Sequence, residues 1–244
     1  MNIPVKVWIR YRDSLAKVSK KAYDEMTKFL DAIGGYGGHE QEVIEFAYAL
    51  ATKYGETTAA LACEMYDAVA KASGVSVPFA EPAATATYTE TAIAVRGTVR
   101  NQNNTIPATV SRLVKQAGAD TTLQNAQRDR AQFAWIPSGD TCAFCITLAS
   151  RGWQTQSKKA LRNGHAEHIH ANCDCQYAVS FTGGSEYKFY DPKKYEDMYY
   201  NADLEFWNTA DGKPPKGDEH AELNTPKNRI NAMRRELYAA SKNK

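Results

Sequence analysis

Apolar residues recur at helical spacing along the first third of the chain. Between residues 4 and 33, large apolar side chains stand three and four positions apart, which places them on one face of a helix. Two glycines follow, and glycine accepts the left-handed conformation in which many helices end. The same pattern predicts a second helix over 39–54 that stops at Gly55, and a third over 56–73. Three helices joined by short turns favour antiparallel packing in a small bundle.

Proline and glycine divide the next part of the chain. Residues 75–88 contain two prolines and have no helical period, which predicts a linker or an exposed loop. Helical character resumes directly after it. Pro107 suits the first position of a helix that ends near Gly118, and Asp120 is placed to cap a further helix that continues to about residue 132.

The section from 133 to 182 has a different character. It holds four of the five cysteines and three of the five histidines. Residues 176–181 are rich in strand formers, with Tyr177, Val179 and Phe181 at alternate positions, and predict a short strand. Beyond them the chain becomes polar and rich in tyrosine, and helices are predicted over 192–206 and from Pro226 onward. The last of these carries a narrow apolar stripe, which either a partner helix or the chain's own core could cover.

The overall composition is that of an ordinary globular protein, with 43% hydrophobic and 24% charged residues. A net charge of +2 is too small to argue for a nucleic-acid or membrane partner. Residues 96–165, however, contain ten Lys/Arg and three Asp/Glu, a local surplus of +7. No signal peptide and no apolar run long enough to cross a membrane is visible, so a protein made in the cytosol is expected. In that reducing compartment, clustered cysteines favour metal binding or catalysis over disulfides.

Five residues of the cysteine-rich section form a candidate zinc site. They are Cys142, Cys145, His170, Cys173 and Cys175. The C-x2-C spacing of the first pair lets two thiolates reach one ion from a single turn of chain. Cys173 and Cys175 project from the same face of an extended segment, and His170 precedes Cys173 by three residues. Thiolates with an imidazole suit tetrahedral zinc. Because there are five candidates for four ligand positions, two ligand sets remain possible: three thiolates with His170, or four thiolates.

Other interpretations of these residues compete with a structural zinc site. A redox-active C-x2-C motif requires a strand before it and a strong helix after it, whereas a Pro-Ser-Gly turn precedes this one. Four inert thiols would make the clustering accidental. His165 and His168 are expected at the surface, with His168 a weak substitute for the histidine ligand. The ligands are numerous enough to close the shell, and Glu167 is the only nearby carboxylate that resembles a general base. We therefore expect a structural site and no enzymatic activity. The isolated Cys63 is expected in the core.

These patterns predict a mainly α fold in three parts. Residues 1–132 form an N-terminal helical domain, residues 133–182 a small α+β module stabilised by zinc, and residues 183–244 a helical C-terminal extension.

Three segments of the chain resemble the zinc motif of phage Mu F-like minor head proteins. They are WIPSGDTCAFC at 135–145, LASRG at 148–152 and HANCDC at 170–175. The earlier helical region looks similar to theirs as well, notably at Arg10-Tyr11-Arg12 and Lys53-Tyr54-Gly55, so the resemblance covers roughly residues 5 to 182. Two positions depart from the family pattern: Ala171 stands where proline is frequent, and Asp174 where arginine is.

The resemblance implies a minor head protein of the virion, made in the bacterial host cytoplasm. Such proteins associate with the portal and the head interior, and they serve head assembly or DNA delivery. The implied partners are the portal, the major capsid protein or both, with non-specific contact to packaged DNA as a further expectation and no membrane. Some relatives carry a fused protease or toxin domain, but residues 183–244 are too few and too poor in catalytic groups for one.

The alternative is a zinc-stabilised DNA-binding protein or nuclease, which the basic surplus motivates. Its cations include Arg112, Arg128, Arg130, Lys158, Lys159 and Arg162. A solvated basic face would explain the same surplus. A nuclease also needs a compact set of acidic or histidine ligands for a catalytic divalent ion, and none is visible apart from the predicted zinc cluster.

Overall fold

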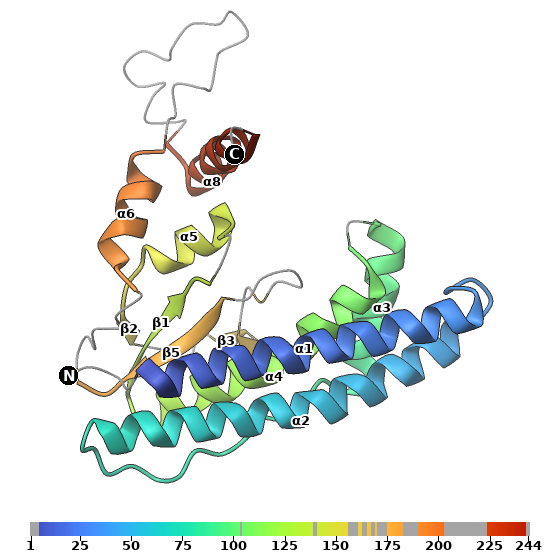
Figure 1. The fold of residues 1–244 in the computed structure, drawn as a ribbon, viewed down its shortest axis with the longest axis horizontal. Helices are drawn as coiled ribbons and strands as arrows, with labels where there is room; N and C mark the ends of the chain where they lie inside the picture. Colours follow the sequence, from blue (N-terminus) through green and yellow to red (C-terminus); the bar gives the residue numbers. More distant parts are fainter. Residues whose placement is uncertain are drawn as a thin grey trace, which may run out of the picture.

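Three long helices lie side by side along the longest dimension of the molecule (Figure 1). They are α1 (Val5–Ile33), α2 (Glu40–Ala72) and α4 (Ile106–Arg128). The shorter α3 (Tyr88–Asn101) contacts both α2 and α4. The prediction of a mainly helical protein is therefore confirmed. The structure, a computed structural model, describes residues 5–102, 104–138, 141–155, 161–162, 165–166, 169, 175–182, 190–202 and 224–242.

Two glycines that were predicted to end helices lie inside continuous ones. Gly55 lies within α2 and Gly118 within α4, so each pair of predicted helices is a single helix. A Cβ atom on Gly55 would lie 2.8 Å from Cγ2 of Thr85, and one on Gly118 would lie 3.2 Å from the backbone oxygen of Thr58. Between the two glycines, Thr58 Oγ1 donates a hydrogen bond of 2.6 Å to the carbonyl of Val114. Glycine is therefore needed there for the close approach of neighbouring chain segments and not for a turn.

Helices α3 and α4 each begin at residues that favour the start of a helix. Residues 75–87 have no regular structure, as predicted, and α3 begins directly after them. Thr87 and Glu90 form a capping box in which each side chain bonds the other residue's backbone N–H. At α4, Thr105 caps the helix and Pro107 stands in its first turn, where its missing N–H leaves no hydrogen bond unmade.

A small sheet packs against the helical bundle. Its strands are β2 (Gln154–Thr155), β1 (Gln132–Ile136) and β5 (Gln176–Ser180), antiparallel and in that order. A separate pair joins β3 (Leu161–Arg162) to β4 (His165–Ala166). Strand β5 confirms the prediction for 176–181. Strand β1 was not predicted: the preceding helix was expected to continue to about residue 132, and no regular element was assigned to the residues directly after it.

The sheet lies between the long helices and α5 (Ala143–Ala149), so both of its faces are covered (Figure 1). All five residues of β5 are buried. The largest core cluster joins Tyr11 and Leu15 of α1 and Tyr66 of α2 to Val179 of β5. Bundle and sheet thus share one hydrophobic core.

Two further helices cover α5 from outside. They are α6 (Pro192–Tyr200) and α8 (Pro226–Lys242). Met233 of α8 is 2% exposed and packs with Ala143 and Ile146 of α5. The predicted apolar stripe of the last helix therefore lies on the chain's own core. In the part of the chain that is described, no helix has the length and apolar character to cross a membrane.

Candidate functional site

Cys142 and Cys145 stand at the start of α5. Cys142 is the N-cap residue, with an extended backbone and an exposed side chain. Cys145 lies in the first turn and is fully buried. The carbonyl of Cys142 accepts a hydrogen bond of 3.0 Å from the N–H of Ile146, which holds the turn in helical form. The C-x2-C motif thus occupies one turn of chain, the arrangement that the predicted zinc site requires.

Cys175 reaches the same region from a different element. It directly precedes β5, is 4% exposed, and belongs to one buried cluster with Cys145 and Trp135. Ile169 joins this cluster too, so the chain enters it next to the predicted histidine ligand. His170 and Cys173 themselves lie outside the described residues.

The buried cluster fits part of a zinc shell. Cys145 and Cys175 present two soft sulfur donors in apolar surroundings, and such donors suit zinc. Among the residues that the structure describes, no three His, Cys, Asp or Glu side chains gather closely enough to hold a metal ion. A complete shell would need Cys142 together with His170 or Cys173, and the zinc site stays a prediction.

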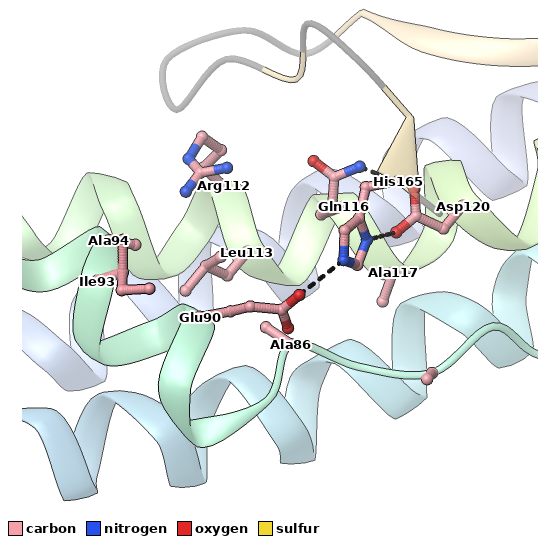
Figure 2. A pocket seen from close by; sticks show the side chains of 11 residues that line it. Ala86, Glu90, Ile93, Ala94, Arg112, Leu113, Gln116, Ala117, Asp120 and His165 are labelled. Atoms are coloured by element: carbon pink, nitrogen blue, oxygen red, sulfur yellow. Dashed lines mark hydrogen bonds and ion pairs between the residues drawn. The ribbon is translucent and has the colours of Figure 1, made fainter. Parts of the chain in front are cut away.

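A polar cluster joins three elements beside this region, around His165 of β4 (Figure 2). The ring donates or accepts at both nitrogens: Nδ1 lies 2.7 Å from Asp120 Oδ2, and Nε2 lies 2.9 Å from Glu90 Oε1. The side chain of His165 is 35% exposed. His165 therefore lies at the surface only in part, because the β3–β4 pair places its ring against Asp120 of α4 and Glu90 of α3.

Asp120 anchors this cluster from inside α4. Its side chain is 1% exposed, and Oδ1 accepts hydrogen bonds from the N–H of Ala166 and, at 2.8 Å, from Gln116 Nε2. The same amide group donates to the carbonyl of Ala166 at 2.8 Å. The prediction that Asp120 caps a helix was wrong: in the middle of a continuous helix, its carboxylate binds the backbone of β4.

The charges of the cluster shift its pKa values. Burial lowers the pKa of His165, but its hydrogen bonds to Asp120 and Glu90 outweigh that effect and raise it above the ordinary value. Burial raises the pKa of Asp120 despite its hydrogen bonds. The backbone N–H of Thr87, and then His165, lower the pKa of Glu90. The folded protein therefore holds a proton on His165 more tightly than an unfolded chain does.

Sequence inspection could have found one member of this cluster. The Thr87-x-x-Glu90 pattern is a capping-box signal and marks the start of α3. No such signal links His165 to Asp120, because 45 residues separate them and only the tertiary fold brings them together.

A model of a protein family described as VG15 protein matches residues 2–202 of the chain. The match takes in the helical bundle, the sheet, the cysteine-rich section and α6, and it ends before α8. No curated protein and no solved structure matches the chain.

Proposed function

Because the chain belongs to the VG15 family, a family of viral proteins, we propose that it is a phage minor head protein. It acts in head assembly or DNA delivery, contacts the portal and the inside of the head, and catalyses no reaction. The observation that carries this proposal is the family match over residues 2–202, which includes the cysteine-rich section. The resemblance of that section to the zinc motif of Mu F-like minor head proteins supports the more specific role.

The structure weakens the basis for a DNA-binding protein or nuclease. Arg128 pairs with Asp129 at 2.8 Å and also donates to the carbonyls of Pro78 and Phe79. Arg112 is half-buried. Arg128, one of the six cations that suggested a nucleic-acid surface, is thus held by contacts within the fold, and we favour the head protein.

We also propose that the protein holds one structural zinc ion. Cys142, Cys145 and Cys175 would supply three thiolates, and His170 or Cys173 the fourth ligand. The shared buried cluster of Cys145 and Cys175 supports this, because α5 and β5 are brought to one place by packing. When bound, zinc would cross-link α5 to the segment before β5 and add folding free energy to the module.

The head function is tested in the phage that encodes the protein. Purified virions are analysed by quantitative mass spectrometry, and the full chain is co-expressed with the portal and major capsid proteins for pull-down. We expect the protein in virions at few copies and in complex with the portal. Absence from virions and from both complexes, together with DNA cleavage that metal removal abolishes, would establish the nuclease alternative instead.

The zinc proposal is tested by metal analysis of chain purified without chelator. We expect about one equivalent per chain. Cys63→Ser is the matched control: Cys63 is half-buried on α2, and burial, with Asp67 nearby, raises the pKa of its thiol to about 11. That variant should keep the zinc, whereas Cys145→Ser should lose it. Folded wild-type protein without zinc would disprove the site.

A further inference from the structure

A slot lies between α3 and α4, next to the His165 cluster (Figure 2). Its volume is about 290 Å³, and most of its wall is aliphatic. The apolar lining comes from Ala84, Ala86, Ile93, Ala94, Leu113 and Ala117. Small-molecule sites usually have such apolar walls with a few polar groups that fix the ligand's orientation.

One cation of the slot has no counter-charge among the residues that the structure describes. Arg112 lines it from α4 and is half-buried. Its guanidinium makes no hydrogen bond or ion pair within the described residues, and burial lowers its pKa. The nearest acids on the wall, Glu90 and Asp120, are both engaged by His165. A cation that is partly removed from water without a partner is costly, and an anion from outside would offset that cost.

We propose that this slot binds a short aliphatic carboxylate. The carboxylate pairs with the planar guanidinium of Arg112, whose parallel N–H groups match its two oxygens. The hydrocarbon tail lies on Leu113, Ile93 and Ala94. This binding site is independent of the proposed head function, and either can fail without the other.

The charges of the slot set the orientation of the ligand. Asp120 follows Arg112 by eight residues on α4, so the two ends of the slot are about 12 Å apart along the helix axis. At the far end, the two carboxylates of Asp120 and Glu90 surround one His165, which leaves that end negative even when His165 is protonated. It repels an anion and directs the carboxylate to Arg112. A tail of roughly four to six carbons spans the space between the two ends.

The test uses the full chain, with hexanoate as the probe and methyl NMR as the readout. We expect saturable shifts of the Leu113 and Ile93 methyl groups. Uncharged hexanamide should bind at least about tenfold more weakly, because it lacks the charge-assisted pair. Arg112→Gln should weaken hexanoate binding by a similar factor, whereas Arg100→Gln, an exposed cation at the end of α3, should leave it unchanged.

A second variant covers the case in which Arg112→Gln fails to fold. Ala94→Phe fills the slot from α3, and it should abolish hexanoate binding while thermal unfolding confirms a folded chain. The proposal is overturned if hexanoate causes no saturable shift in the wild type. It is equally overturned if hexanamide binds as well as hexanoate, or if folded Arg112→Gln or Ala94→Phe binds like the wild type.

Discussion

Replacing Gly55 with alanine should destabilise the protein, although alanine is the better helix former. The new Cβ would lie 2.8 Å from Cγ2 of Thr85 and 3.5 Å from Cβ of Ala117. The first distance is far below ordinary van der Waals contact, and Thr85 is β-branched and stiff. Overpacking of this kind costs about 1–3 kcal/mol, while Gly→Ala inside a helix returns about 0.5–1 kcal/mol. We expect a net loss of about 1 kcal/mol, with about 2.5 kcal/mol as the upper end.

Urea and thermal unfolding followed by far-UV circular dichroism measure this difference. For a chain of this size, each kcal/mol lowers Tm by about 2–4 °C. Gly97→Ala is the matched control, because Gly97 lies inside α3 and a Cβ there would meet no atom within 4 Å. That variant should gain about 0.5–1 kcal/mol, since it receives the helix benefit without a clash.

A rescue variant separates the clash from other effects. Thr85→Ser removes the offending Cγ2 methyl group, so Gly55→Ala should cost less in the Thr85→Ser background than in the wild type. The reasoning is refuted if Gly55→Ala stabilises the protein as Gly97→Ala does, or if its cost is the same in both backgrounds.

Three further predictions concern the polar cluster, a helix cap and the zinc module. His165→Gln should cost about 1 kcal/mol at acidic pH, a value reduced for the partial exposure of the ring. Because the pKa of His165 is raised in the folded state, this stabilisation is fully present below about pH 6.5 and is lost as the pH rises through the folded pKa. Urea unfolding of the wild type and the variant should therefore show a difference in unfolding free energy that shrinks as the pH rises. Thr87→Ala removes the N-cap of α3 and should cost about 1 kcal/mol in the same assay, while an unchanged midpoint would argue against the capping box. Cys145→Ser, or chelation of the metal, should lower hydrogen-exchange protection at 176–180 more than it lowers protection in α1. Equal protection with and without metal would contradict a structural role for zinc.

The sequence by itself determined the elements whose signals are local. The three- and four-residue spacing over 4–33 is sufficient for α1, because one apolar face must pack on a neighbour whatever that neighbour is. The Thr105–Pro107 start of α4 and the strand at 176–180 follow equally from residues within a few positions. A C-x2-C motif on one turn of chain is local as well, and the structure has it at the start of α5.

Tertiary structure decided the meaning of residues whose partners are distant in sequence. Glycine often ends a helix, and Gly55 and Gly118 were predicted to do so, yet α2 and α4 continue through them. Glycine is present at these positions because the close approach of Thr85 and Thr58 leaves no room for a side chain. No local pattern distinguishes these two uses of glycine.

The same holds for the charged residues and the cysteines. From sequence alone, Asp120 is compatible with a helix cap and His165 with a solvent-exposed position. The fold instead places His165 Nδ1 2.7 Å from Asp120 Oδ2 in a partly buried network. Cys145 and Cys175, 30 positions apart in the chain, meet in one cluster only because β5 pairs with β1 and α5 covers the sheet. Hydrogen bonds and apolar contacts form only between groups a few ångströms apart in space. The number of residues between two groups along the chain does not tell how far apart they lie in the folded protein.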